Sequence, residues 1–376
     1  MTAAGRRRAW ALIAGGGTGG HVVPAIAIGQ ALVARGHVAG TIRFVGSSRG
    51  LERRMVPEAG FEVTLLPGRG IARRFTIDNV GAAAGLAAAL VKALILVGRL
   101  RPAIIVSVGG YASVAGALAG VVWRVPLVVA EQNAVPGVAN KLVGRFAAVC
   151  AVSFPGTALP RAVVTGNPVR AQIRAVDRSD RGRAEARTAL GLPPDGFVVV
   201  VAGGSLGARR INDVVVRLAS EWAGRAGVAI RHVIGERDFD TVRAAAPEAS
   251  VGGLIYQQVR FEDRMDLVLA AADVAVQRAG ASTISELTAV GVPSILVPLP
   301  GAPGDHQTAN ANRLADAGAA MVISDAELDT ARLAAALDTV IDDDDIRRAM
   351  GEAARQLGRP DAAEAVAALA EAHARA

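Results

Sequence analysis

The sequence predicts an α/β fold with two domains, each built around a parallel β-sheet. A short apolar run at 9–13 leads into the glycine-rich stretch 14–24 (AGGGTGGHVVP) and then into an apolar, helix-like segment. The same order of strand, glycine loop and helix returns at 197–211, where the loop has the sequence AGGSLGARR. We interpret this return as a weak duplication of one βα unit. The length of 376 residues exceeds one ordinary core, so two domains are expected.

Further apolar runs of strand length alternate with Ala-rich, helix-like segments. They are 41–45, 61–66, 104–108, 127–130 and 147–152 in the first half, and 229–234, 254–256, 274–277 and 294–297 in the second. Fully apolar strands that alternate with helices are typical of a parallel sheet covered on both faces. The pattern breaks at the turn sequence GNPVR, which predicts domains of 1–166 and 167–376. We expect the last helix to pack back on the first domain.

The charge is distributed unevenly. The first 165 residues contain 18 Lys and Arg against 5 Asp and Glu, a net charge of +13, whereas the remainder contains 23 against 29, a net charge of −6. A basic first half suggests an anionic surface or ligand. Aromatic residues amount to only 3% and no nucleic-acid-binding motif is found, so we expect no nucleic-acid partner. The single cysteine, Cys150, excludes an intramolecular disulfide and favours a reducing compartment.

The first glycine loop predicts a phosphate site, because a strand, a glycine loop and a helix together direct backbone N–H groups at an anion. The alternative is a tight turn without a ligand. Gly15, Gly17 and Gly20 also satisfy the G-x-G-x-x-G pattern of dinucleotide-binding folds. That pattern needs an acidic residue near the end of the second strand, where the sequence GSSR (46–49) has none. Arg49 suits NADP, so an NADP-dependent oxidoreductase stays open as an alternative.

A second candidate site is the sequence RAGASTISE (278–286), which follows a predicted strand. Ser282 and Thr283 are placed to face a diphosphate, and Glu286, one helical turn later, to accept both ribose hydroxyls. The alternative is a capping box that joins Thr283 to Glu286. Other polar clusters also follow strands, namely 131–133, 167–170 and 305–307. Several polar loops at one cleft favour a binding site.

Metal ligands are not indicated. The pair Asp238 and Asp240 has the D-x-D spacing of manganese-dependent sugar transferases, but it more simply opens a helix. The five histidines show no ligand spacing, and His37, His232 and His373 are interpreted as surface or strand residues. We therefore expect neither a metal nor another cofactor.

Seven motifs occur in order along nearly the whole chain: GGTGGH (16–21), GGY (109–111), EQN (131–133), GNPVR (166–170), GGSLGAR (203–209), RAGASTISE (278–286) and DHQTANA (305–311). Together they resemble the MurG family, the peripheral N-acetylglucosaminyltransferases of bacterial peptidoglycan synthesis in glycosyltransferase family 28. The resemblance implies a GT-B fold, with two Rossmann-like, doubly wound domains that face a cleft. It further implies that the first domain binds the acceptor and associates with the membrane, and that the second binds UDP-GlcNAc.

The resemblance also implies an inverting transfer of GlcNAc from UDP-GlcNAc to the C4 hydroxyl of lipid I, undecaprenyl-pyrophosphoryl-MurNAc-pentapeptide, giving lipid II. The implied catalytic residues are His21, Tyr111 and Glu131. The positions that match donor contacts are Thr18, Gly19, Gly20, Asn133, Arg170, Ser205, Ala281, Ser282, Thr283, Glu286 and Gln307. Three neighbours in the same motif, Arg278, Ile284 and Ser285, are expected to contact the substrate as well. Glu262 departs from the family pattern, which often has an apolar residue there.

The chemistry of these residues agrees with such a reaction, because histidine, with a reference pKa of about 6.5, accepts a proton near neutral pH. A non-catalytic nucleotide-sugar-binding or membrane scaffold protein remains a further alternative. The expected place of action is the cytoplasmic face of the bacterial inner membrane, with cell-wall synthesis and division proteins as partners. In the first domain an apolar set lies beside a basic set and predicts docking on anionic lipid. The apolar set is Ile71, Phe75, Leu94, Ile95, Leu96, Val97, Leu100 and Trp123, and the basic set is Arg69, Arg73, Arg74, Lys92, Arg99, Arg101 and Arg124.

Overall fold

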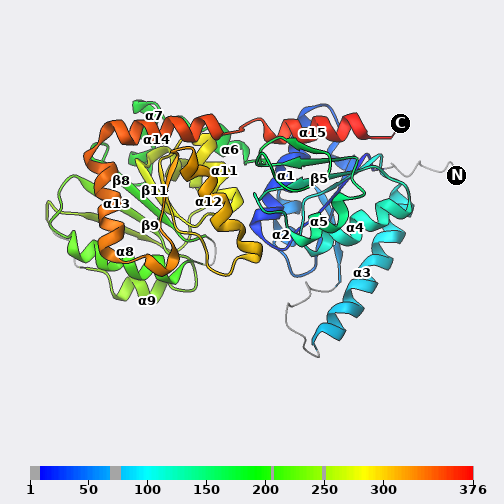
Figure 1. Ribbon diagram of the computed structural model, residues 1–376, viewed down its shortest axis with the longest axis horizontal. Helices are drawn as coiled ribbons and strands as arrows, with labels where there is room; N and C mark the ends of the chain where they lie inside the picture. The colour runs from blue at the N-terminus through cyan, green and yellow to red at the C-terminus, as the bar shows by residue number, and fades with distance from the viewer. Residues whose placement is uncertain (1–8, 68–77, 205–206, 248–250, 376) are drawn as a thin grey trace. The chain divides into compact units, whose positions relative to one another are not determined.

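The computed structural model describes residues 9–67, 78–204, 207–247 and 251–375, and the side chains of 78–84 are not described. The chain forms two compact units (Figure 1). The first contains the chain up to Arg170 together with the segment from Arg359 onward, and the second is Ala171–Gly358. The segment from Arg359 holds the last helix, α15 (Ala362–His373), so this helix belongs to the first unit.

The first unit contains a parallel sheet of seven strands in the order β3-β2-β1-β4-β5-β6-β7. The strands are β1 (Ala11–Ala14), β2 (Ile42–Ser47), β3 (Glu62–Leu66), β4 (Ile104–Ser107), β5 (Leu127–Glu131), β6 (Val149–Val152) and β7 (Ala162–Val164). The helices besides α15 are α1 (Gly19–Ala34), the 3-10 turn η1 (Ala39–Thr41), α2 (Glu52–Glu58), α3 (Asp78–Leu100), α4 (Tyr111–Val122) and α5 (Val138–Gly144).

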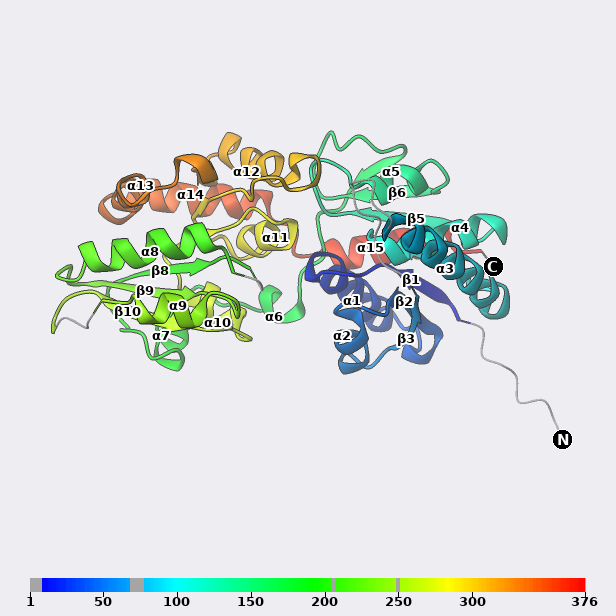
Figure 2. The same ribbon diagram turned by 90° about the horizontal axis from the view of Figure 1, so that it is seen from below.

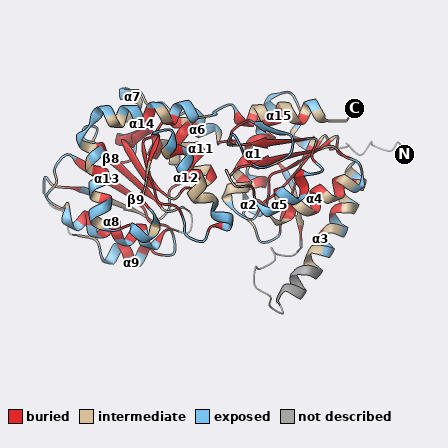
Figure 3. Cartoon of the chain, in the orientation of Figure 1, coloured by how far each residue is buried: buried red, intermediate tan, exposed pale blue. Residues whose placement is uncertain are grey.

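Alternate residues of each strand in this sheet serve two separate cores, as the period of two in a strand requires. Ala11 and Ile13 face the core formed with α1 and α15, whereas Leu12 and Ala14 face the core formed with α3 and α4. Both cores are rich in Ala and Val, and Figure 3 shows the strands between them as buried. Burial on both faces explains why these strands are continuous apolar runs in the sequence.

The second unit repeats this plan with six parallel strands in the order β10-β9-β8-β11-β12-β13. The strands are β8 (Phe197–Ala202), β9 (Val228–Val233), β10 (Ile255–Val259), β11 (Val274–Gln277), β12 (Ser294–Leu296) and β13 (Ala320–Val322). The helices are α6 (Ala171–Arg174), α7 (Asp180–Ala189), α8 (Arg209–Glu221), α9 (Phe239–Ala244), α10 (Met265–Ala271), α11 (Ala281–Val290), η2 (Pro303–Asp305), α12 (His306–Asp316), η3 (Asp325–Glu327), α13 (Thr330–Asp342) and α14 (Asp344–Leu357). Helices α8 and α13 pack on one face of the sheet, and α7 and α10 lie on the other (Figure 2).

The structure corrects the predicted elements at a few places. Helix α1 begins at Gly19, not near residue 25, because Thr18 is extended and serves as its N-cap. His21 therefore lies in the first turn of a helix and not in a loop. The short edge strands β7 and β13 were not predicted, because they are largely not buried and so carry no clear apolar pattern. Within the described part of the chain, no helix combines the length and the apolar character that crossing a membrane requires.

Candidate active site

Both sheets change the direction of their strand order at one point, between β1 and β4 in the first unit and between β8 and β11 in the second. In open parallel sheets, ligands bind outside the carboxyl ends of the strands at such a point. Four turns leave these strand ends: 15–18 after β1, 108–110 after β4, 203–207 after β8 and 278–280 after β11. All four belong to motifs singled out in the sequence.

In the first unit, the turns after β1 and β4 pack backbone against backbone. The amide of Gly16 donates to the carbonyl of Gly109 at 3.4 Å. Gly110 has φ 85°, and a Cβ there would overlap the carbonyl oxygen of Gly16. Only glycine fits this contact. The contact brings the amino ends of α1 and α4 together, since each helix starts directly after its turn.

His21 lies beside both of these turns. Its Nδ1 is 3.3 Å from the hydroxyl of Thr18, and a Cβ built on Gly109 would be 3.1 Å from its Nε2. The ring is half-buried. Gly19 and Gly20 are the first residues of α1, where amides have no partner within the helix. Thr18, Gly19, Gly20 and His21 are thus brought together as predicted from the sequence, beside donors suited to an anion.

Tyr111 opens α4, and its hydroxyl donates to the carbonyl of Pro67 at 3.1 Å. Burial raises the pKa of this phenol, so it remains a neutral donor. The hydrogen bond ties the end of β3 to the start of α4. This arrangement suits a residue that positions the site.

Glu131, at the end of β5, organises the loop that follows it. Its carboxylate accepts from the amide and the side chain of Asn133 at 2.9 and 3.2 Å, from the amide of Gly137 at 3.0 Å and from Asn140 at 2.9 Å. The side chain is buried. Four donors around one carboxylate occupy its oxygens and fix its orientation. Glu131 therefore holds Asn133 and its loop in place.

Sequence reasoning missed Glu52, the first residue of α2. Its buried carboxylate accepts from the amide of Gly17 at 2.9 Å and also from the amide of Ser47. The dinucleotide hypothesis sought an acid at the end of β2 to hold a ribose. The acid is there, but it is bound beneath the glycine turn. Its carboxylate occupies the amide of Gly17, one of those that a cofactor phosphate would need.

In the second unit, the turns after β8 and β11 line a hollow of about 460 Å³. Its lining includes Gly203, Gly204, Arg209, Arg278, Gly280, Thr283 and Gln307. The Gln307 side chain accepts from the amide of Leu299 at 3.0 Å, which fixes its orientation. Arg278 is tied to the carbonyls of Val297 and Pro298 and to Asp325, at 3.2, 3.1 and 2.6 Å. Arg278 thus holds the loop after β12 while it lines the hollow.

Helix α11 starts at Ala281 with Gly280 as its N-cap, and no side chain caps it. The capping-box alternative is therefore wrong, because Thr283 lies inside the first turn and lines the hollow. The hydroxyl of Ser282 is buried without a hydrogen-bond partner among the described residues. The hydroxyl of Ser285 donates to the carbonyl of Ala281 at 2.8 Å, and the half-exposed Glu286 follows one turn along.

Ile284, Arg170 and Ser205 are the remaining predicted contact residues. The Ile284 side chain is buried in the core, and its amide donates to Gly280, so it has no group left for a ligand. Arg170 is the last residue of the first unit before the chain enters the second, and it is half-exposed. Ser205 lies outside the described residues.

A buried polar network supports the glycine turn after β8. His232, fully buried on β9, bonds Tyr256 at 2.8 Å through Nδ1 and Asn212 at 3.0 Å through Nε2. Asn212 donates to the carbonyl of Ile234 at 3.1 Å, directly under Gly207, whose φ of 77° only glycine adopts readily. Burial lowers the pKa of His232 to about 3, so the imidazole stays neutral. Sequence reasoning treated His232 as an ordinary strand residue and missed this role.

Asp238 and Asp240 do not form a metal pair. Asp238 precedes α9 and binds Arg237 at 3.0 Å, and Arg237 lowers the pKa of its carboxyl. Asp240 binds Arg260 at 2.7 Å. Across the described ranges, no three His, Cys, Asp or Glu side chains are grouped as metal ligands.

Comparisons with known proteins agree along both units. Residues 11–152 match the glycosyltransferase family 28 N-terminal domain, and residues 198–366 match its C-terminal domain. The chain belongs to glycosyltransferase family 28. Two relatives, from Nocardioides sp. and Acidothermus cellulolyticus, are each 40% identical to it. Both are UDP-N-acetylglucosamine--N-acetylmuramyl-(pentapeptide) pyrophosphoryl-undecaprenol N-acetylglucosamine transferases. The Nocardioides alignment covers 95% of this chain and 96% of the relative, and the other covers 96% of each.

The crystal structure of Acinetobacter baumannii MurG superposes on this family 28 chain with a TM-score of 0.76. The two share 27% sequence identity over 96% of this chain and 99% of that one. The fold is therefore GT-B, as the resemblance implied. Family 28 consists of glycosyltransferases, so the NADP-dependent oxidoreductase is excluded.

Proposed function

We propose that this family 28 chain transfers GlcNAc from UDP-GlcNAc to the C4 hydroxyl of lipid I, with inversion, to form lipid II. The observation that carries the proposal is the match over nearly the full length, at 40% identity, to relatives named as N-acetylglucosamine transferases of N-acetylmuramyl-(pentapeptide) pyrophosphoryl-undecaprenol. The hollow in the second unit supports it, since glycine turns, a helix amino end and Gln307 line one space.

The donor is proposed to lie in that hollow. The amides of the turn after β8 and of the first turn of α11 offset the charge that grows on the departing diphosphate. Glu286 accepts the two ribose hydroxyls. The unpartnered hydroxyl of Ser282 and the nearby Thr283 supply further donors to phosphate oxygens. These roles need no side chain beyond those that the fold already holds at the ends of β8 and β11.

The acceptor is proposed to bind the first unit, with His21 as the general base. Neutral His21 takes the proton of the C4 hydroxyl, the C4 oxygen forms a bond to C1 of GlcNAc, and the bond from C1 to the UDP oxygen breaks. The amides of Gly19 and Gly20 at the start of α1 bind the acceptor pyrophosphate. Tyr111 and Glu131 position the neighbouring helix and loop.

A surface on α3 and the end of α4 is proposed to dock on the membrane. Ile95, Val122 and Trp123 are exposed, and Trp123 is anchored to α3 by donating to the carbonyl of Leu94 at 2.9 Å. Lys92, Arg99, Arg101 and Arg124 are exposed beside them. Val97 was expected in this set, but it is buried in the core because it lies on the opposite face of α3. Ile71, Phe75, Arg69, Arg73 and Arg74 lie outside the described residues.

Apolar side chains with a basic rim suit an anionic leaflet. We therefore propose peripheral attachment to the cytoplasmic face of the inner membrane, where a lipid-linked acceptor is reached. Cell-wall synthesis and division proteins are the partners proposed with it.

The test is transfer of radiolabelled GlcNAc from UDP-GlcNAc to lipid I in detergent micelles, with and without EDTA. The expected product is labelled lipid II, at a rate that EDTA leaves intact. UDP binding is measured in parallel by calorimetry. Binding of UDP without any transfer contradicts the proposal and favours the non-catalytic nucleotide-sugar-binding protein.

A further inference from the structure

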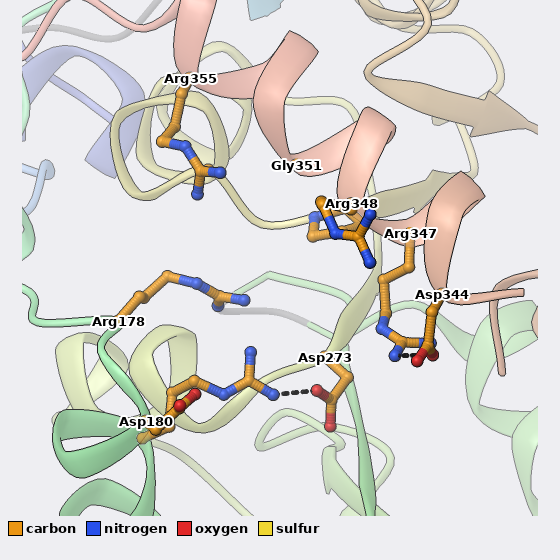
Figure 4. A pocket seen from close by; sticks show the side chains of 11 residues that line it. Arg178, Asp180, Asp273, Asp344, Arg347, Arg348, Gly351 and Arg355 are labelled. Carbon is orange, nitrogen blue, oxygen red and sulfur yellow. Dashed lines mark hydrogen bonds and ion pairs between the residues drawn. The ribbon is translucent and has the colours of Figure 1, made fainter.

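The second unit has another hollow, of about 350 Å³ (Figure 4). It is bounded by α7, by α14, by Asp273 just before β11, and by the turn 291–293 just before β12. It thus lies at the amino ends of these strands. The donor hollow lies at the carboxyl ends, so the two are separate sites.

Arginine side chains dominate this second hollow. Arg178, Arg183, Arg347, Arg348 and Arg355 line it, against the carboxylates of Asp180, Asp273 and Asp344. Figure 4 shows the guanidinium groups of Arg178 and Arg355 directed toward the same space. Five cations against three anions leave an excess of positive charge on the lining.

The carboxylates are largely used by other arginines. Arg183 pairs with Asp273, which also binds Arg187 at 2.7 Å from behind the lining. Arg347 pairs with Asp344, and Arg348 binds the neighbouring Asp345 at 2.8 Å. Within the part of the chain that the structure describes, Arg178 and Arg355 form no ion pair with a carboxylate.

Both of these arginines are nevertheless held in place. Arg178 donates to the carbonyl of Leu269 at 2.7 Å, and the stem of Arg355 lies against Gly291. Burial lowers the pKa of Arg178 to about 10, with Arg183 as the next cause, so the guanidinium remains charged at neutral pH. Two positioned cations that make no ion pair with a described carboxylate therefore border the same hollow.

We propose that this hollow binds a small anion with one or two phosphoryl groups, held by Arg178 and Arg355. Guanidinium groups match phosphate oxygens with paired hydrogen bonds, and charge-assisted bonds of this kind are the strong ones. The volume of about 350 Å³ accommodates a diphosphate or a small phosphate ester rather than a protein segment. An acidic peptide is the competing occupant and is an outcome of the test.

The test is calorimetric titration of the full chain with inorganic pyrophosphate and, separately, with inorganic phosphate, in the presence of saturating UDP. UDP fills the proposed donor hollow, and the anion site proposed at Gly19 and Gly20 is the same in all the proteins compared, so the difference between wild type and variant reports this hollow. We expect saturable binding by the wild type, and at least about a tenfold loss of affinity in Arg178→Gln/Arg355→Gln. The matched control, Arg181→Gln/Arg217→Gln, removes two exposed charges of the same unit and should bind like the wild type.

The single variant Arg355→Gln removes an exposed guanidinium and keeps the test valid if loss of Arg178 impairs folding. Absence of saturable binding in the wild type, or equal affinity in the double variant, overturns the proposal. Binding of a poly-glutamate peptide in place of both phosphates also overturns it. None of these readouts depends on GlcNAc transfer, so the outcome is distinct from that of the proposed function.

Discussion

At the scale of single residues, His21 carries the proposed proton transfer, and its surroundings are a hydroxyl and two glycine turns. His21→Asn keeps a similar volume but removes the base, so we expect kcat to fall by about a hundredfold or more. The base acts as neutral imidazole, so wild-type activity should decline toward acidic pH, and this decline should disappear in the variant. His373→Asn, at the end of α15, is the control and should leave both kcat and the decline toward acidic pH unchanged.

A pH profile of kcat/KM for both variants is the measurement. If the loss is under tenfold and the acidic limb persists in His21→Asn, another group takes the proton.

Glu286 gives the second prediction. If it binds the ribose, Glu286→Ala removes charged hydrogen bonds and should cost about 2 to 4 kcal/mol of transition-state binding. The measurement is kcat/KM for UDP-GlcNAc. Glu352→Ala, an exposed glutamate on α14, is the matched control. An unchanged kcat/KM in Glu286→Ala would remove this residue from the site.

The sequence predicted both glycine loops and the RAGASTISE turn, because a glycine run between an apolar strand and a helix is a local signal. It did not predict Glu52, since this contact joins residues 35 positions apart and depends on how α2 lies beneath the turn. The sequence did not predict the positioning role of Glu131 either. Its motif marked it as important, but only the four donors around its carboxylate distinguish a positioning residue from a base.

At the scale of elements, β9 and α8 support the donor turn through the neutral His232. The unfolded chain binds a proton at this histidine below a pKa of about 6.5, whereas the folded chain does so only near pH 3. Stability should therefore fall as the pH decreases from 6.5 toward 3. Between pH 7 and pH 5, protonation linked to His232 should lower the free energy of unfolding by about 2 kcal/mol.

The measurement is urea unfolding of the wild type, His232→Gln and the control His306→Gln at both pH values. We expect His232→Gln to be less stable at pH 7 and to show a smaller loss on acidification. Identical pH dependence in all three proteins would show that His232 does not govern it.

Element boundaries show where sequence reasoning is weak. Most buried strands were predicted, because strands that are apolar on both faces stand out from Ala-rich helices. The start of α1 was predicted too late, since the low helix propensity of Gly19 and Gly20 argues against a helix. Packing of that turn against the one after β4 decides the conformation.

At the scale of the whole molecule, the positive charge of the first unit is proposed to act at the membrane. Each basic residue near an anionic surface adds about 1 kcal/mol, so reversing the charge of Arg99 and Arg124 to Glu should release the protein from vesicles. Binding should also weaken with salt. The measurement is co-sedimentation with phosphatidylglycerol vesicles at low and high salt.

The matched control reverses two exposed charges of the second unit, Arg217→Glu and Arg332→Glu, and should sediment like the wild type. Both proteins should bind UDP with unchanged affinity. If the variant with Arg99 and Arg124 reversed sediments with vesicles as the wild type does, the basic surface does not serve membrane docking.

The position of α15 has a consequence for synthesis in the cell. This helix leaves the ribosome after the whole of Ala171–Gly358, yet Val366, Ala367 and Ala370 complete a core whose strands were made first. The first unit therefore cannot complete this core until α15 has been made, although Ala171–Gly358 is by then available to fold on its own. A nascent chain stalled before Arg359 would keep an open apolar sheet face, which makes it a substrate for chaperones.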